Sequence, residues 1–466
     1  MYEFKYSSII ENDVNTVFDW HKRPMLLQRL TPPWENISIR STNIPDNSFL
    51  LKNGQVSLCQ KIAPFLKIPW KVKHKNYKEN ELFEDEMIYG PFKYWNHKHI
   101  FEELPNNRTR LTDLIHYEPF IKIKRIDSYI KNKLTLSFNY RHKITKNDLE
   151  HPLYNAKQET IMVAGSTGLI GSHLIPILSS FGFKIIRLRY NEKNKITFKE
   201  SKEGVIDISW NPYSNKKLIF DELKNQNIKY LINLAGENIL GYPSIRKKKA
   251  IIHSRVTSTQ SLLNIIRNNK INIDCALHAS ATGIYKENNG STITESSPKG
   301  DGFLARTTIE WEHEQNKFEN IVNRNVNMRI GAVLSLKGGM LKNLIIPYKL
   351  RIGTKMDCAS NYVSSISIED LCRAIIFIIN NKNISGPVNM VSPESTKLNN
   401  IFDLLNEQLN PILKISAPKK ILSSFGKEIV DEMLFSNHNI IPDVLNKNLF
   451  KFKDENFKVS IQGMIF

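Results

Sequence analysis

Three glycines at intervals of three residues, Gly165, Gly168 and Gly171, give the stretch MVAGSTGLIGSHL a spacing suited to phosphate binding. An apolar run precedes them and a helical pattern follows, which predicts a turn between a strand and a helix. In such a turn the first glycine permits the bend, the second admits a pyrophosphate, and the third lets helix and strand pack closely. Unpaired N–H groups at the start of the helix, with the hydroxyls of Ser166 and Thr167, favour bound phosphate. A tight turn without a ligand is the alternative interpretation.

The end of the following strand selects the nucleotide that this turn would hold. A carboxylate there would bind a ribose 2′-hydroxyl, whereas an arginine accommodates a 2′-phosphate. Arg189 ends this strand in IIRLRYNE, nearer its end than Arg187 on the same face, so we expect NADP(H) in preference to NAD(H). An ordinary surface arginine is the alternative. The residues expected to contact the cofactor here are Gly165, Ser166, Thr167, Gly168, Leu169, Ile170, Gly171 and Arg189.

The glycine turn opens a long region in which short apolar runs alternate with helical stretches. TIMVAG, KIIRLR, YLINLAG, CALHASAT and VNMRIGAV are runs of the kind that a parallel sheet buries on both faces. This alternation predicts an α/β fold, a Rossmann-type doubly wound parallel sheet, over residues 159–392. A small helical domain is expected over residues 393–466.

The first 148 residues have a different pattern. Alternating runs such as WKVKHKNY and LFEDEMIY predict antiparallel strands, and IDSYIKNKLTLSFNYRHKI predicts a long closing helix. A curved sheet that grips this helix would bury its apolar stripe, so we expect an α+β helix-grip domain over residues 1–148. The polar segment 149–158 is the predicted linker.

Composition narrows the classes of protein and partner. A chain of 466 residues is too long to fold around a single ordinary hydrophobic core, so several domains are expected. The net charge of +19 comes from lysine spread along the chain, with one basic cluster, RKKK at 246–249, so no nucleic-acid partner is predicted. The sequence has no apolar run of membrane-spanning length and no signal-peptide pattern, and its four cysteines lack metal-ligand spacing; these features predict a cytoplasmic protein without a membrane partner.

Linked motifs in this order resemble one family: MVAGSTGLIGSHL, LINLAGENI, IIHSRVTST, HASATGIY, TESSP, WEHE and RIGAVLSLKGGML. They are similar to the epimerase-like branch of the extended short-chain dehydrogenase/reductases, of the SDR39U1 and YfcH type. The segment APKKILSSFGKEIVDEMLFSNHNIIPDVLNKNLFKF resembles the small C-terminal domain of that branch. FDWHKRPMLLQRLTPPW and FEDEMIYGPFKYWNHKHIF resemble the START-like SRPBCC domain fused to some of its members.

The resemblance assigns further site residues. It implies that Leu234, Ala235 and Gly236 lie along the adenosine half of the cofactor, and that Ser280 faces the nicotinamide and polarises a substrate oxygen. Arg255 and Arg329 also match family positions, where we expect mainly structural roles.

In short-chain dehydrogenase/reductases at large, a tyrosine exchanges a proton with the substrate oxygen and a lysine four residues later lowers its pKa. Phe303 and Thr307 stand at the corresponding positions after TESSP, so the usual dyad is absent. Members of the branch that this chain resembles generally lack a clean dyad, so its loss does not by itself imply inactivity. Possible substitutes nearby are Tyr285, Arg306 and Glu310. Motifs on the substrate side also differ from those of the family. Ser365 and Ser367 stand where Trp and His are usual, and Lys286 stands where glycine is usual.

Two functions follow from these features. The first is an NADP(H)-dependent, epimerase-like oxidoreductase acting on a small carbonyl or hydroxyl substrate. The alternative is a catalytically weak or inactive NADP(H)-binding or sensing protein whose N-terminal domain binds a hydrophobic ligand. Aromatic side chains could line such a cavity or simply form core: Trp34, Trp70, Phe92, Trp95 and Phe101. His97 and His99 share a strand face, but without a third ligand at suitable spacing no metal is predicted.

Overall fold

The computed structural model describes residues 1–35, 37–43, 54–61, 66–151, 159–192, 198–200, 205–214, 223, 226–239, 244–355, 361–416 and 437–464. Two compact units are present. The first consists of residues 1–158, 175–185 and 200–205, and the second of residues 159–174, 186–199 and 206–466. Most of the predicted linker and residues 417–436 of the segment that resembles the C-terminal domain fall outside the described residues. The predicted domain boundaries stay predictions.

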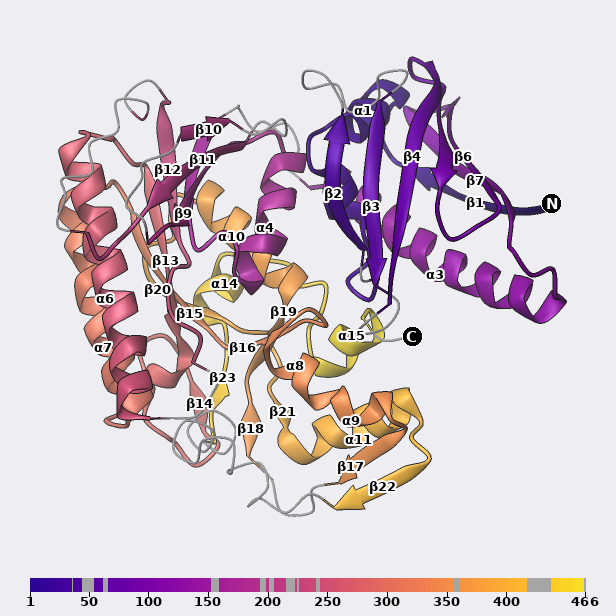
Figure 1. The fold of residues 1–466 in the computed structure, drawn as a ribbon. Coiled ribbons are helices and arrows are strands. Elements are labelled where there is room, and N and C mark those ends of the chain that lie inside the picture. Colours follow the sequence, from indigo (N-terminus) through magenta and orange to yellow (C-terminus); the bar gives the residue numbers. More distant parts are fainter. Residues whose placement is uncertain are drawn as a thin grey trace. The chain divides into compact units, whose positions relative to one another are not determined.

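The first unit contains a seven-stranded antiparallel sheet in the order β1-β7-β6-β5-β4-β3-β2 (Figure 1). Its strands are β1 (Tyr2–Ile10), β2 (Ile37–Asn43), β3 (Gln55–Lys61), β4 (Lys67–Lys78), β5 (Leu82–Tyr89), β6 (Tyr94–Leu104) and β7 (Arg108–Glu118). Where the structure describes residues 1–158, the helices beside this sheet are α1 (Val14–His21), α2 (Leu26–Leu30) and α3 (Lys124–Leu149). Helix α3 packs on one face through Phe138, whose ring centroid lies 5.7 Å from that of Phe4. The predicted antiparallel strands and closing helix are therefore present, whereas the helix-grip classification stays a prediction.

The second unit is built on an eight-stranded sheet in the order β10-β11-β9-β8-β12-β13-β15-β20. Its strands are β8 (Thr160–Ala164), β9 (Lys184–Tyr190), β10 (Phe198–Glu200), β11 (Val205–Trp210), β12 (Ile228–Asn233), β13 (Cys275–Ala281), β15 (Asn325–Ile330) and β20 (Gly386–Met390). The pairs from β8 through β12, β13 and β15 to β20 are all parallel. The chain reverses its direction of strand addition at β8, as in a doubly wound nucleotide-binding sheet. The predicted Rossmann-type α/β fold is confirmed.

Helices cover both faces of this sheet. α6 (Ile245–Asn268) and α7 (Phe303–Asn316) lie on one face, and α10 (Ile368–Asn380) lies on the other (Figure 1). Helix α4 (Leu169–Ser180) follows β8 directly. Among the described residues, no helix is both long and apolar enough to cross a membrane.

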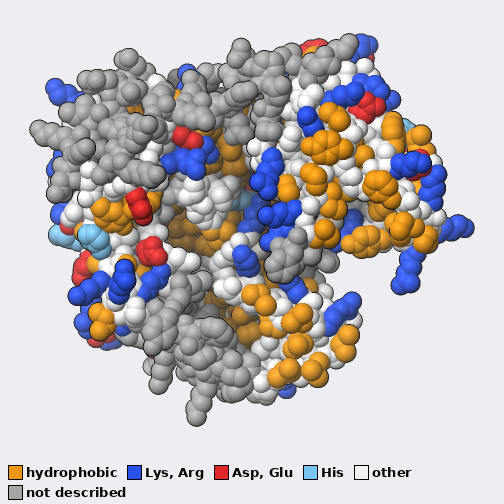
Figure 2. Space-filling view, viewed as in Figure 1, with side chains coloured by type: hydrophobic (Ala, Val, Ile, Leu, Met, Phe, Trp, Pro, Cys, Tyr) orange, Lys and Arg blue, Asp and Glu red, His pale blue; other side chains and the backbone are white. Residues whose placement is uncertain are grey.

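The rest of the second unit packs around the core residues Leu334, Leu341, Leu405 and Phe457. Its helices are α8 (Gly339–Leu344), α9 (Ile346–Lys349), α11 (Leu398–Leu409), α14 (Asp443–Lys447) and α15 (Phe457–Gln462). Short strand pairs complete it: β14 (Thr292–Ile293) with β23 (Asn439–Ile440), β16 (Ala332–Leu334) with β19 (Ser365–Ser367), β17 (Ile352–Lys355) with β22 (Leu413–Ser416), and β18 (Tyr362–Val363) with β21 (Thr396–Lys397). Figure 2 shows hydrophobic side chains on the surface of this part, where Ile346, Leu350, Ile412 and Leu413 are exposed.

Candidate nucleotide-binding site

The turn between β8 and α4 is a close-packed junction that two of its glycines make possible. Gly165 has a φ of +79°, and a Cβ atom there would lie 2.4 Å from the carbonyl group of Leu234. A Cβ atom on Gly171 would lie 2.4 Å from the carbonyl oxygen of Gly165. Neither position can carry a side chain without moving backbone, so these two glycines are required by the fold itself.

Gly168 differs from its two neighbours in the motif. A Cβ atom there would meet only the carbonyl oxygen of Gly165 among the described residues, at 3.4 Å, which is an ordinary contact. The backbone of Gly168 also does not have the positive φ that would favour glycine. The protein's own packing therefore gives no reason for glycine at this exposed position.

Ser166 presents a second unusual feature in the same turn. The residue is 5% exposed, and its hydroxyl oxygen is buried without a hydrogen-bond partner among the described residues. An unpaired buried hydroxyl destabilises a fold, so it indicates either strain or a partner supplied from outside. Thr167 and Gly168 beside it are exposed, and Leu169 and Ile170 are partly buried as the helix begins. The turn thus has features that would suit the phosphate group predicted from the sequence.

The end of β12 lies against this turn. The amide of Leu234 donates to the carbonyl oxygen of Ala164 at 2.9 Å, which ties the ends of β12 and β8 together. The amide of Ala235 donates to the side chain of Asn233, and Gly236 is exposed, with space limited by Arg255. The residues predicted along the adenosine half are therefore brought next to the glycine turn.

Arg189 lies at the carboxyl end of β9 with its side chain 51% exposed. Arg187 binds both carboxylate oxygens of Asp207 on β11, at 2.6 and 2.9 Å. Arg189 reaches the same carboxylate at 3.3 Å, so both arginines lie on one face of the strand, as predicted. Asp207 was not singled out from the sequence, because the pairing of β9 with β11 could not be read from it.

The start of helix α7 carries no proton-transfer dyad. Phe303 is its first residue and Thr307 follows one turn later, with its hydroxyl donating to the carbonyl oxygen of Phe303 at 2.8 Å. The ammonium group of Lys248 on α6 lies 4.9 Å from the centroid of the Phe303 ring. A cation is therefore close to the expected dyad position, but neither Phe303 nor Thr307 supplies a phenol or ammonium group.

Ser280 lies inside a hydrogen-bonded network rather than at an open surface. It is 4% exposed and donates to Glu312 Oε1 at 2.7 Å. Arg329 donates to both oxygens of the same carboxylate, at 2.9 and 3.0 Å. Glu312 occurs in the WEHE motif, but its contact with Ser280 depends on how α7 packs on β13 and was not predicted.

The proposed substitutes for the missing tyrosine are poorly placed for proton transfer. The hydroxyl of Tyr285 donates to Asn389 at 2.6 Å and accepts from Arg329 at 2.9 Å. Burial raises the pKa of Tyr285 to about 12, against the opposing effect of Arg329. Tyr285 is therefore not an acid poised near neutral pH. Arg306 and Glu310 are exposed on α7.

Arg255, like Arg329, makes internal contacts. Its guanidinium donates to the carbonyl oxygens of Ile251 and Glu237, and lies 5.0 Å from the ring centroid of Trp311. Burial lowers the pKa of Arg255 to about 10. These contacts support the structural role expected of it. Ser367, where the family has histidine, accepts from the amide of Asp370 and so caps α10.

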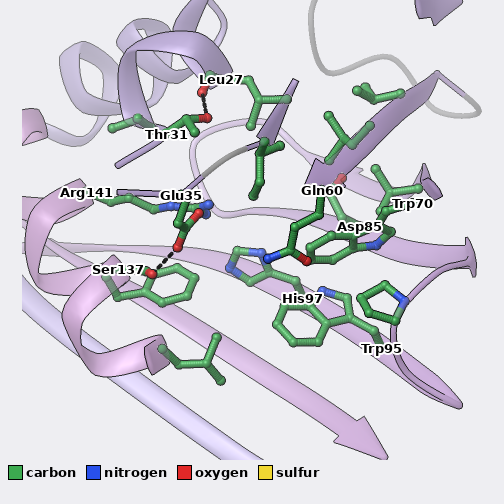
Figure 3. A pocket seen from close by; sticks show the side chains of 18 of the residues that line it. Leu27, Thr31, Glu35, Gln60, Trp70, Asp85, Trp95, His97, Ser137 and Arg141 are labelled. Carbon is green, nitrogen blue, oxygen red and sulfur yellow. Dashed lines mark hydrogen bonds between the residues drawn. The ribbon is translucent and has the colours of Figure 1, made fainter. Parts of the chain in front are cut away.

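A cavity of about 620 Å³ lies in the first unit (Figure 3). Four of the five aromatic residues considered from the sequence line it: Trp34, Trp70, Phe92 and Trp95. Phe101 does not line it, since its ring packs 4.9 Å from that of Phe18 in the core. Figure 3 shows Asp85 and His97 near Trp70 and Trp95, with Glu35, Ser137 and Arg141 across the cavity.

Comparisons with known proteins find relatives for the part of the chain that contains the glycine turn. Residues 161–308 match the family described as the NAD dependent epimerase/dehydratase family. An epimerase family protein of Staphylococcus epidermidis is 28% identical over 309 residues, which cover 65% of this chain and 98% of that protein. One from Mycobacterium bovis is 28% identical over 293 residues, which cover 63% of this chain and 93% of that protein. Residues 161–308 are thus similar to the NAD dependent epimerase/dehydratase family.

Two solved structures share the fold. The nucleoside-diphosphate sugar epimerase from Corynebacterium glutamicum gives a TM-score of 0.74 at 23% identity, covering 99% of this chain and 90% of that one. The human epimerase family protein SDR39U1, solved with NADPH, gives a TM-score of 0.55 at 20% identity, covering 66% of this chain and 98% of that one. The three chains thus share a Rossmann-like α/β fold.

Proposed function

We propose that the second unit binds NADP(H) at the turn formed by residues 165–171. The observation that carries this proposal is Gly168, which no neighbour among the described residues requires to be glycine. A pyrophosphate lying against the backbone supplies the missing reason, because a side chain would occupy its place. The unpaired hydroxyl of Ser166 would donate to the same group. The family name and the NADPH in the human SDR39U1 structure support the same cofactor class.

The exposed guanidinium of Arg189 supports a choice of NADP(H) over NAD(H). Arg187 already compensates the charge of Asp207, which leaves Arg189 able to turn toward a 2′-phosphate. Arginine suits phosphate because its planar fork can donate two hydrogen bonds to it.

Of the two functions predicted from the sequence, the geometry favours the NADP(H)-binding or sensing protein with weak or absent turnover. Bound NADP(H) supplies or accepts a hydride at its nicotinamide. The protein must then hold or move a proton at the substrate oxygen, and the usual dyad for this is missing. The hydroxyl of Ser280 donates to Glu312, so polarising a substrate carbonyl would require that bond to break. An epimerase-like oxidoreductase on a small carbonyl or hydroxyl substrate is the second candidate, favoured by the match to the epimerase/dehydratase family.

The first unit would serve as a START-like, helix-grip domain that binds an apolar ligand. The support is the cavity of about 620 Å³ with aromatic side chains around it. A volume of this size suits a small apolar molecule.

The test of the nucleotide proposal is calorimetric titration of the full chain with NADPH, comparing Gly168→Ala and Gly168→Asp with the parent. We expect affinity to fall at least ~10-fold for alanine and further for aspartate, whose charge repels phosphate. Gly463→Ala is the matched control, since a Cβ atom there also makes only ordinary contacts, at 3.7 Å or more. Unchanged NADPH affinity in both Gly168 variants would refute the proposal.

Turnover is tested separately by following NADPH oxidation against a broad panel of small carbonyl compounds. We expect NADPH binding with little or no oxidation. Rapid oxidation that Ser280→Ala abolishes, while NADPH affinity stays unchanged, would establish the oxidoreductase instead.

A further inference from the structure

A row of histidine and aspartate side chains crosses the sheet of the first unit. His74 on β4 pairs with Asp85 on β5, Asp85 pairs with His97 on β6, and His99 pairs with Asp113 on β7. Residues directly opposite each other on neighbouring strands project to the same face. His74, Asp85, His97 and His99 line the cavity, as Figure 3 shows for Asp85 and His97.

Three of these side chains converge closely enough to share one ion. Asp85, His97 and His99 each offer a ligand atom, and these three atoms all lie within 4.8 Å of one another. His99 Nε2 and Asp85 Oδ2 are 3.7 Å apart, and the two imidazole centroids are 3.9 Å apart. The sequence analysis considered only His97 and His99, and the register of β5 and β6 brings Asp85 beside them as a third ligand.

Asp113 holds both imidazoles in one orientation. Its Oδ1 atom accepts from His97 Nε2 at 2.7 Å and from His99 Nδ1 at 2.8 Å. Its Oδ2 atom accepts from His142 Nε2 at 2.6 Å. Because a carboxylate only accepts, these nitrogens carry protons. An ion would be bound through His97 Nδ1 and His99 Nε2, and His99 Nε2, which lies beside Asp85 Oδ2, must give up its proton to bind it. A buried carboxylate behind histidine ligands is a recurrent support of metal sites.

The surroundings favour a cation at this place. Asp113 is 3% exposed and the side chain of Asp85 is 19% exposed, so two carboxylates are withdrawn from water. The ring of Phe83 stacks on that of His99 with 4.0 Å between their centroids, and the ring centroids of Phe138 and His97 are 5.3 Å apart. Carboxylates in such an apolar setting need compensating positive charge, which either a bound ion or a protonated imidazole, such as that of His74 beside Asp85, can supply. A network of histidines and aspartates without an ion is the competing explanation.

We propose that Asp85, His97 and His99 bind a zinc ion in the cavity of the first unit, with Asp113 positioning the two histidines. Zinc accepts nitrogen and oxygen ligands without a preferred d-electron geometry, and sites with three protein ligands keep a further position open. Because the three ligands line the cavity, that position faces it and suits an anionic or carbonyl oxygen of a ligand held there. The proposal does not depend on nucleotide binding by the second unit.

The test uses the tag-free full chain, stripped with a chelator and titrated with zinc chloride by calorimetry. We expect one equivalent of zinc per chain, and binding weakened at least ~100-fold in Asp85→Asn and in His97→Gln, while Asp113→Asn loses ~10- to 100-fold. The matched control is His116→Gln: His116 lies on β7 opposite Asn96, pairs with Glu3 and does not line the cavity. Its zinc affinity should equal that of the parent.

Cobalt(II) substitution gives a second readout that does not depend on stability. We expect visible d–d absorption bands in the parent and in His116→Gln, and their loss in Asp85→Asn. Far-ultraviolet circular dichroism verifies that each variant is folded. Absence of zinc binding by the parent, binding of iron(II) but not zinc, or equal binding by all variants would overturn the proposal.

Discussion

At the scale of single residues, the proposed preference for NADP(H) over NAD(H) depends on how Arg187 and Arg189 share the carboxylate of Asp207. Arg187 takes both oxygens of Asp207, whereas Arg189 makes one longer contact of 3.3 Å and stays half-exposed. An exposed pair of this kind contributes ~0–1 kcal/mol, so Arg189 can leave it for a phosphate at little expense. A bidentate bond to a 2′-phosphate would be stronger.

Replacing Arg189 by alanine should therefore separate the two coenzymes. We expect NADPH affinity to fall at least ~10-fold while NADH affinity changes little, because only NADPH carries the 2′-phosphate. Titration of each coenzyme by its fluorescence measures both values. Lys184→Ala removes the same charge from the other end of β9 and should leave both affinities unchanged. Equal losses for NADPH and NADH in Arg189→Ala would show that the arginine does not read the phosphate.

At the scale of elements, the sequence was informative wherever periodicity alone decides structure. The apolar runs of residues 159–392 predicted a parallel sheet, since strands buried on both faces need continuous apolar residues. Glycine spacing located the turn before α4 because steric limits act between near neighbours. Contacts that depend on strand register or helix docking were out of reach. Asp207 beside Arg189, Glu312 beside Ser280 and Asp85 beside His97 all belong to this class.

Strand β13 carries an element-scale prediction about acid stability. His278 on this strand is fully buried, with its ring 4.4 Å from that of Phe318. Burial lowers its pKa to about 3, so the folded protein holds it neutral. Stability from this residue is present above pH ~6.5, its unfolded value, and is lost as pH falls toward 3. Between pH 6.5 and 5 the loss is about 2 kcal/mol.

His278→Leu should flatten this acid-side decline in the unfolding transition of the second unit. Urea unfolding at pH 7 and pH 5 measures the difference. His313→Leu changes an exposed histidine on α7 and should keep the parent's pH dependence. A decline as steep in His278→Leu as in the parent would mean that other groups cause it.

At the scale of the whole molecule, the division into two compact units predicts two unfolding transitions. NADPH at 100 times its dissociation constant should stabilise the second unit by about 2.7 kcal/mol, because it binds only the folded form. The other transition should not move. Differential scanning calorimetry measures both transition temperatures. Gly171→Ala forces a Cβ atom against the backbone, so the transition whose temperature it lowers is that of the second unit. A single transition that shifts as a whole would show instead that the units unfold together.

The buried, unpaired hydroxyl of Ser166 should affect the free energy of unfolding differently with and without nucleotide. Without nucleotide, the side chain lacks a partner among the described residues, and Ser166→Ala should raise the free energy of unfolding by ~1 kcal/mol. With NADPH at saturation the order should invert, because the serine then gains a phosphate acceptor that alanine cannot use. Thermal melts of both proteins, with and without the coenzyme, would reveal this crossing. An alanine variant that is less stable under both conditions would argue against it.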